Sequence, residues 1–235
     1  LDIKNPLIVT DKGSPKLPFI TNLQSYLANS NVKSDLFFDI SPNPREDEVS
    51  VGCKKFKDGS HDAIIAIGGG SAMDGGKLIC LTANNDVPLR HFEFELTPPK
   101  INKDNPFPKI ITIPTTAGTG AETEITAMVT YLKEGMKFCM WHPDVRPSLA
   151  LIDPELTLGL PSNLTAWTGV DALIHGIEGY CVPGFNPLCD GAALEGLSLI
   201  SKSLVKAVEE PQNILARGGM HVGSCLAGIS FLKGL

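Results

Sequence analysis

Short aliphatic runs that alternate with helix-like stretches are the feature that most restricts the fold of this chain. Strand-sized runs occur at residues 7–10, 35–40, 63–67, 109–113 and 149–152, and helix-like stretches lie between them at residues 20–28, 45–57 and 71–82. Several of the runs are almost continuously apolar, which is typical of parallel strands buried on both faces. The alternation predicts a doubly wound, Rossmann-like α/β domain, and residues 125–132 and 136–141 predict a hairpin inserted in it.

The strand signals stop after Pro161. Residues 163–180, 186–209 and 211–233 have helix-like patterns, so we expect an α/β domain over residues 1–160 followed by an all-helical domain over residues 161–235. The chain begins at Leu1 rather than at a methionine and ends at Leu235 within an apolar helical pattern. We therefore expect truncation at both ends and an incomplete helical domain.

Composition excludes several classes of function. The chain has 26 acidic and 20 basic side chains in 235 residues, and this negative balance argues against binding to nucleic acid. No run approaches the roughly 20 apolar residues that cross a membrane, and no secretory signal is visible. The six cysteines form no C-x-x-C pair and are expected to be reduced thiols, so we predict a cytoplasmic protein.

A glycine-rich run follows the strand at residues 63–67. Gly68, Gly69, Gly70 and Ser71 stand where the strand should pass into a helix. Because glycine has no Cβ atom, a ligand can approach the backbone closely at these positions. The N–H groups at a helix N-terminus then favour an anionic ligand such as a diphosphate. The run is neither a G-x-G-x-x-G fingerprint nor a P-loop, and the alternative is a tight turn with Ser71 as the helix N-cap.

Two further sets of polar residues follow predicted strands. Thr115, Thr116 and Thr119 come after the strand at residues 109–113 and offer hydroxyl groups to a ligand at the carboxyl edge of the sheet. Alternatively, Thr119 and Glu122 form a capping box that begins a helix. Asp11 follows the first strand, where a carboxylate accepts ribose hydroxyls and favours NAD over NADP, or simply forms a turn.

Asp171 and His175 are separated by four residues in a predicted helix and therefore share one face. A carboxylate and an imidazole at this spacing bind a divalent cation when further ligands converge on it. The alternatives are a capping box of Thr168 with Asp171 and a structural histidine. The other four histidines show no pairing at ligand spacing and are interpreted as structural or exposed: His61, His91, His142 and His221. No G-x-S-x-G elbow occurs, so hydrolase chemistry is not expected.

Six motifs in this order resemble the iron-containing (group III) alcohol dehydrogenases, which have a dehydroquinate-synthase-like fold. The motifs are Leu7 to Lys12, Pro42 to Pro44, Gly68 to Lys77, Pro114 to Glu122, Leu151 to Pro154 and Thr168 to Tyr180. The resemblance implies an NAD-dependent, metal-dependent alcohol dehydrogenase that interconverts small primary alcohols or diols with aldehydes. It also implies a homodimer.

The same resemblance implies roles for individual residues. Asp11 would contact the adenosine ribose, Asn43 the adenosine side, and Gly68, Gly69, Gly70 and Ser71 the diphosphate, with Asp74 close by. Thr115, Thr116 and Thr119 would line the nicotinamide half, Lys137 would hold the nicotinamide ribose, and Leu156 and Leu160 would wall the groove. Asp171 and His175 would be the first two ligands of Fe²⁺, or of Zn²⁺, which this ligand set would hold at least as well. The catalytic histidine and two more ligands are expected beyond Leu235.

Two competing functions remain at this point. A lyase similar to dehydroquinate synthase shares the fold but needs basic residues around a phosphorylated substrate, and Lys202, Lys206 and Arg217 are spaced like solvent-facing residues. Alternatively, a chain that ends at Leu235 is an NAD-binding fragment without turnover, because it carries two of four expected ligands.

Overall fold

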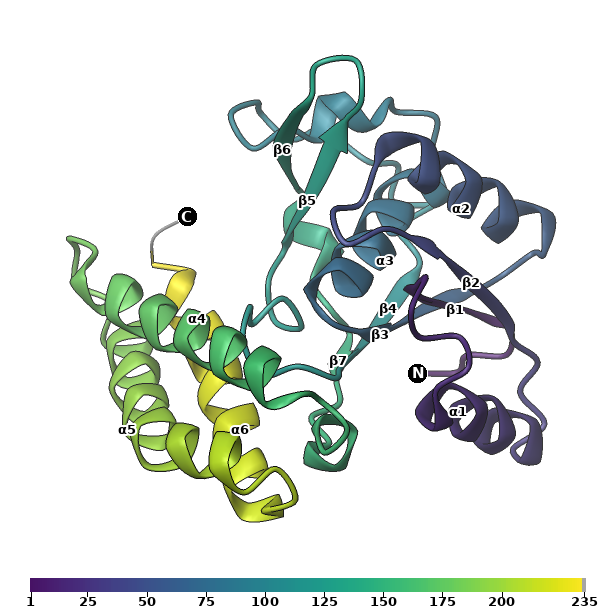
Figure 1. The fold of residues 1–235 in the computed structure, drawn as a ribbon. Coiled ribbons are helices and arrows are strands. Elements are labelled where there is room, and N and C mark those ends of the chain that lie inside the picture. The colour runs from purple at the N-terminus through teal and green to yellow at the C-terminus, as the bar shows by residue number, and fades with distance from the viewer. Residues whose placement is uncertain (234–235) are drawn as a thin grey trace. The chain divides into compact units, whose positions relative to one another are not determined.

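A computed structural model describes residues 1–233 (Figure 1). The chain forms two compact units. Unit 1 comprises residues 1–113 and 125–150, and unit 2 comprises residues 114–124 and 151–235. The expected domains, 1–160 and 161–235, divide the chain differently, because the unit boundary falls at residue 151 and residues 114–124 belong to the helical unit. Residues 234 and 235, the end of the expected helical domain, lie outside the described residues.

Unit 1 contains a five-stranded sheet in the order β2-β1-β3-β4-β7. The strands are β1 (Pro6–Asp11), β2 (Asp35–Ile40), β3 (Ala63–Gly68), β4 (Lys109–Pro114) and β7 (Leu149–Ala150). β1 pairs in parallel with both β2 and β3, and β4 with β7. β3 is buried along its whole length, as the aliphatic run predicted, because helices cover both of its faces.

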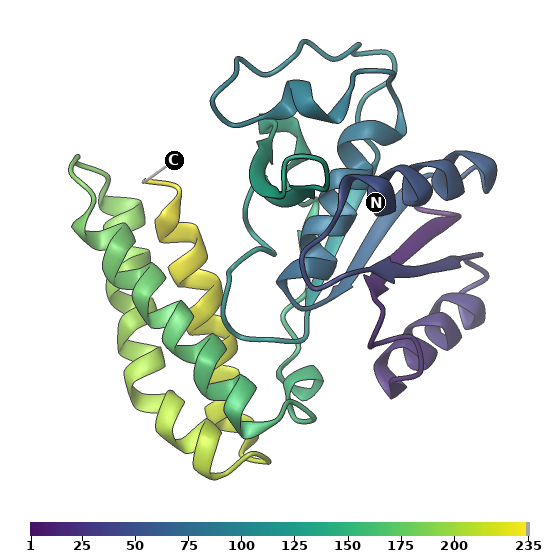
Figure 2. The same ribbon diagram turned by 45° about the horizontal axis from the view of Figure 1, so that its top comes forward.

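Three helices flank this sheet: α1 (Pro18–Asn29), α2 (Glu46–Asp58) and α3 (Gly70–Ala83). Figures 1 and 2 show α1 on one face and α2 with α3 on the other, which confirms the doubly wound arrangement. An antiparallel hairpin of β5 (Thr126–Tyr131) and β6 (Met136–Trp141) is inserted after β4. Short 3₁₀ turns complete the unit: η1 (Leu89–Phe92) and η2 (Pro143–Val145).

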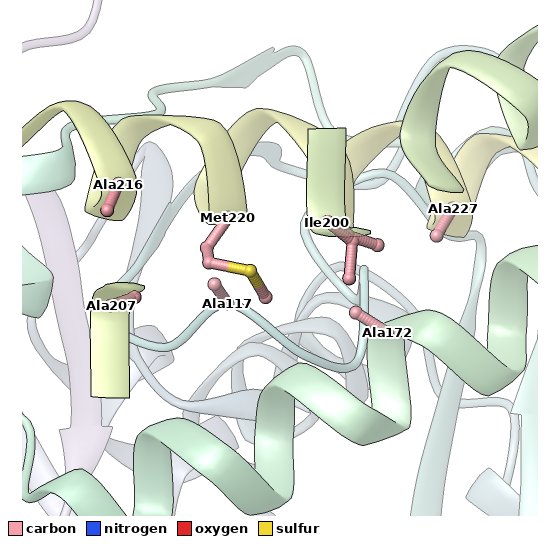
Figure 3. Close-up of a cluster of buried hydrophobic side chains, with 7 residues drawn as sticks. All are labelled: Ala117, Ala172, Ile200, Ala207, Ala216, Met220 and Ala227. Atoms are coloured by element: carbon pink, nitrogen blue, oxygen red, sulfur yellow. The ribbon is translucent and has the colours of Figure 1, made fainter. Parts of the chain in front are cut away.

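Unit 2 is helical, with a 3₁₀ turn η3 (Pro154–Thr157) and the helices α4 (Ser162–Cys181), α5 (Pro187–Glu209) and α6 (Ile214–Phe231). Its core consists of small side chains around Met220 and Ile200 (Figure 3). Small residues let backbones approach closely: a Cβ on Gly120 would lie 2.5 Å from the Cα of Gly228. Ala117 belongs to the same cluster, which explains why the 114–124 loop is part of this unit.

Three capping alternatives from the sequence are wrong. Residues 115–124 form bends and turns, so no helix begins at Thr119. Thr168 lies inside α4, where its hydroxyl donates to the Leu164 carbonyl at 2.9 Å. The N-cap of α3 is Gly69 rather than Ser71. Among the described residues, none of the helices has the length and apolarity that crossing a membrane requires.

Candidate cofactor and metal sites

The junction of β3 and α3 in unit 1 has the geometry of a phosphate cradle. Gly68 adopts a φ of +144°, which residues with a side chain rarely adopt. A Cβ at Gly68 would lie 2.7 Å from the Cβ of Ala72 and 3.2 Å from Asp11 Oδ2. The first turn of α3 contains no acidic residue, so its N–H groups and positive dipole end favour an anion.

Thr10 and Asp11 lie beside this cradle. The Thr10 hydroxyl is buried without a hydrogen-bond partner among residues 1–233, and it lies 3.5 Å from where a Cβ on Gly68 would be. A buried hydroxyl normally has a partner, so this one indicates that a ligand supplies it. The cradle and the orphaned hydroxyl therefore fit a dinucleotide.

The Asp11 carboxylate also forms a turn, as the alternative predicted. Its Oδ1 accepts from the backbone N–H of Gly13, and its Oδ2 accepts from the Ser14 hydroxyl, both at 2.8 Å. A carboxylate has about four acceptor positions, so two remain for ribose hydroxyls. The turn thus orients Asp11 without excluding the ribose role.

Asn43 and Lys137 lie on neighbouring segments of unit 1. Thr130 of the hairpin donates its N–H to the Pro44 carbonyl at 2.7 Å, and Thr130 pairs with Lys137 across the hairpin. Asn43 and Lys137 are both exposed, whereas Ser71 and Asp74 of α3 are half-buried. The loop that carries Asn43 is therefore held against the strand pair that carries Lys137.

Asp171 and His175 lie on one face of α4 in unit 2, as the spacing predicted. His175 Nε2 is 3.8 Å from Asp171 Oδ1, too long for a hydrogen bond but suited to a shared cation at roughly 2.0–2.2 Å from each atom. The Nδ1 atom of His175 is buried and unpartnered within the described chain. No set of three or more His, Cys, Asp or Glu groups around a metal position occurs in residues 1–233. The pair therefore fits two ligands of a divalent cation.

The other predicted contacts of the nicotinamide half are also in unit 2. Thr115, Thr116 and Thr119 are half-buried on the 114–124 loop, where Thr119 Oγ1 accepts from the Ala121 N–H at 3.2 Å. Leu156 lies on η3, and Leu160 lines a small cavity of about 10 Å³ together with Thr157, Thr165, Thr168, Ala117, Arg217 and Met220. All of these residues belong to the helical unit.

Arg217 corrects one interpretation of the sequence. It is buried rather than solvent-facing, with an exposed fraction of 2%. Its guanidinium donates to Thr165 Oγ1 at 2.7 Å and to the carbonyls of Pro211 and Leu160 at 3.0 and 3.3 Å. Its donors are engaged by the chain itself, so it adds no free cation for a phosphorylated substrate. Helical spacing did not reveal this because the three acceptors lie outside α6, in α4 and in the segments before α4 and α6.

Two other buried polar residues were not singled out by the sequence patterns. His221 is fully buried, with the backbone groups of Asp153 and Pro114 beside its ring. Burial lowers the pKa of His221 from 6.5 to about 4, although the Asp153 carboxylate and nearby backbone groups oppose this effect. Glu48 is 5% exposed, and its Oε1 atom forms an ion pair with Lys12 Nζ at 2.7 Å. Lys12 is the last residue of the Leu7 to Lys12 motif, but nothing in the sequence spacing indicated Glu48 as its partner.

The fold is thus a doubly wound α/β unit of the nucleotide-binding type joined to a helical unit. Two family models match it: "Iron-containing alcohol dehydrogenase" over residues 1–154, and the C-terminal model of that family over residues 165–233. The chain therefore belongs to the iron-containing alcohol dehydrogenase family.

Individual relatives agree with this assignment. The chain is 35% identical over 230 residues to 1,3-propanediol dehydrogenase of Citrobacter freundii, covering 97% of this chain and 58% of the relative. It is 33% identical to NAD-dependent methanol dehydrogenase of Bacillus methanolicus, covering 98% and 59%. The chain therefore spans about three-fifths of the length of these curated relatives.

Solved structures give the same result. A crystal structure of 1,3-propanediol oxidoreductase matches with a TM-score of 0.92 and 34% identity, over 97% of this chain and 59% of that one. Sulfoacetaldehyde reductase from Bifidobacterium kashiwanohense in complex with NAD⁺ matches with a TM-score of 0.85 and 33% identity, over the same two shares. The expected resemblance to the iron-containing alcohol dehydrogenases is therefore confirmed at the level of fold and family.

Proposed function

We propose that this chain is the NAD-binding and partial metal-binding portion of an alcohol dehydrogenase that interconverts a small primary alcohol or diol with its aldehyde. The observation that carries the proposal is the Gly68 cradle, with the Asp11 carboxylate and the unpartnered Thr10 hydroxyl beside it. Relatives named for propanediol and methanol support the substrate class, and a neighbour solved with NAD⁺ supports the cofactor.

Each residue has a defined part in the proposal. The first turn of α3 binds the diphosphate, Asp11 accepts the adenosine ribose, and Asn43 and Lys137 bind the adenosine side and the nicotinamide ribose. Thr115, Thr116 and Thr119 contact the nicotinamide half, with Leu156 and Leu160 excluding water. Asp171 and His175 hold Fe²⁺ or Zn²⁺. When bound, the cation supplies Lewis-acid polarisation of the substrate oxygen and NAD supplies a hydride acceptor.

The family resemblance extends the proposal to a homodimer located in the cytoplasm. The six free cysteines are consistent with a reducing compartment.

The lyase alternative is disfavoured by the structure of unit 2. Arg217 donates hydrogen bonds to its own chain, and the Lys202 ammonium donates to the half-buried Ser198 hydroxyl at 2.9 Å. A phosphorylated polyol acid would need unengaged cations. The alternative of an NAD-binding chain without turnover has more support, because residues 1–233 bring no third His, Cys, Asp or Glu ligand to Asp171 and His175.

The test is calorimetric titration of the chain with NAD and NADP, in wild type and in Asp11→Gly. We expect wild type to bind NAD more tightly than NADP, and Asp11→Gly to lose most of this preference, because the carboxylate both accepts ribose hydroxyls and repels a 2′-phosphate. Asp2→Gly, near the N-terminus and exposed, is the matched control. An unchanged preference in Asp11→Gly contradicts the ribose role.

Turnover is measured separately, as NADH formation from 1,3-propanediol with added Fe²⁺ or Zn²⁺. We expect the 235-residue chain to bind NAD without turnover, since two ligands hold a metal weakly. Clear turnover would show that these residues suffice for the reaction and would exclude the binding-only alternative.

A further inference from the structure

An ion cluster lies at the carboxyl ends of β1 and β2 in unit 1. Lys12 Nζ donates to Glu48 Oε1 at 2.7 Å and to Ser41 Oγ at 2.9 Å. The Ser41 N–H donates to Glu48 Oε2 at 3.0 Å, and the Arg45 N–H donates to the same atom at 3.3 Å. Glu48 is 5% exposed, whereas the Lys12 side chain is 47% exposed. A buried carboxylate therefore holds a lysine that solvent still reaches.

The cluster adjoins the proposed ribose site. Lys12 directly follows Asp11, and its backbone N–H donates to the Ile40 carbonyl at the end of β2. The turn that orients Asp11 thus also determines where the Lys12 side chain begins. The lysine is a cation next to the carboxylate that discriminates between the two forms of the cofactor.

Glu48 is the acid that neutralises this cation. Burial acts to raise the pKa of Glu48, but hydrogen bonds from Lys12 and Ser41 outweigh it and hold that pKa below its usual value. The carboxylate is therefore ionised at neutral pH. The other nearby cation, Arg45, has its Nη2 atom 3.6 Å from Glu48 Oε1 but also donates two hydrogen bonds at 3.0 and 2.9 Å to Asp47, so it keeps an acidic partner without Glu48.

We propose that Glu48 enforces the preference for NAD over NADP by neutralising Lys12, which would otherwise pair with a 2′-phosphate. A 2′-phosphate needs an unengaged cation, and Asp11 alone repels it. Loss of the Glu48 charge releases Lys12, whose flexible side chain can then reach toward the ribose. This inference rests on the proposed cofactor function.

The experiment compares the affinities of the whole chain for ADP-ribose and 2′-phospho-ADP-ribose by calorimetry. These probes contain the adenosine half alone, so the result does not depend on a metal or on turnover. Glu48→Gln keeps the size of the side chain and removes its charge. We expect the affinity ratio to shift by about tenfold toward the 2′-phosphorylated probe, the effect of one additional partly screened charge near the ligand.

Three more variants test whether the effect of Glu48→Gln comes from the release of Lys12. Glu48→Gln combined with Lys12→Gln should lose the gain, because the released cation is gone. Asp58→Asn is the matched control: it removes an acid of the same helix from the exposed pair with Lys54 and should leave the ratio unchanged. Lys12→Gln alone removes the cation and keeps the Glu48 charge, so it should strengthen the discrimination. The proposal is therefore testable even if Glu48→Gln does not fold.

The outcomes separate the inference from the function. If wild type binds ADP-ribose but Glu48→Gln leaves the ratio within twofold, or if the double variant keeps the gain, the inference is wrong and the cofactor assignment stands. If wild type binds neither probe, the cofactor assignment fails and the inference fails with it.

Discussion

Replacement of Gly68 by alanine tests the cradle directly. The backbone at Gly68 has a φ of +144°, a conformation that costs a residue with a Cβ about 1–3 kcal/mol. The new Cβ would also lie 2.7 Å from the Cβ of Ala72, and such overpacking costs about 1–3 kcal/mol more. We therefore expect Gly68→Ala to lower the free energy of unfolding by about 2–6 kcal/mol in total.

The assay is urea and thermal unfolding followed by circular dichroism. The expected loss corresponds to a melting temperature lower by roughly 4–24 °C. Gly135→Ala separates the two causes, because Gly135 has a φ of +63° with nothing within 4 Å of the added Cβ. It should lose only about 1–2 kcal/mol, from backbone strain alone. A loss in Gly68→Ala no larger than in Gly135→Ala would refute the close-packing argument.

Three further predictions concern unit 2. Burial lowers the pKa of His221 from 6.5 to about 4, so between these pH values the unfolded chain binds a proton more readily than the folded chain. The free energy of unfolding should therefore fall by about 3 kcal/mol as the pH decreases from 6.5 to 4. His221→Leu should flatten this part of a pH series of unfolding curves, and an equally steep slope in the variant would contradict the assignment. Arg217→Met leaves two carbonyls and a hydroxyl without their donor, so it should lower the free energy of unfolding in urea by about 3–5 kcal/mol. A loss as small as that caused by Lys206→Met, at an exposed position, would show that the buried hydrogen bonds contribute little. Asp171→Asn should weaken Zn²⁺ binding, measured by calorimetry, by about tenfold or more because an anionic ligand is lost, whereas Glu178→Gln on the same helix should not.

The element order was predictable because it depends on local patterns. The run at residues 63–67 predicted β3, and the glycines after it predicted the turn into α3, since backbone conformation and apolar periodicity are set by near neighbours. The pair of Asp171 and His175 was predictable for the same reason, as four residues make about one helical turn. The family resemblance then supplied Asn43, Lys137, Leu156 and Leu160, which spacing alone did not single out.

Side chains whose environment is formed by distant segments were not predictable. Arg217 has a spacing compatible with solvent exposure, yet its partner Thr165 lies 52 residues away in the sequence. His221 is buried for a similar reason, facing Asp153 from another element. A periodic pattern identifies the face of a helix on which a residue lies but not what packs against that face.

The sequence by itself therefore determined the doubly wound order, the glycine-rich turn, the Asp171 and His175 pair, and the family. The tertiary structure alone decided that residues 114–124 belong to the helical unit, where Ala117 packs in its core. It also decided that Glu48 neutralises Lys12 across 36 residues of sequence. The physical reason is range: hydrogen bonding and chain geometry act between near neighbours, whereas burial and charge pairing depend on which distant segments the fold brings together.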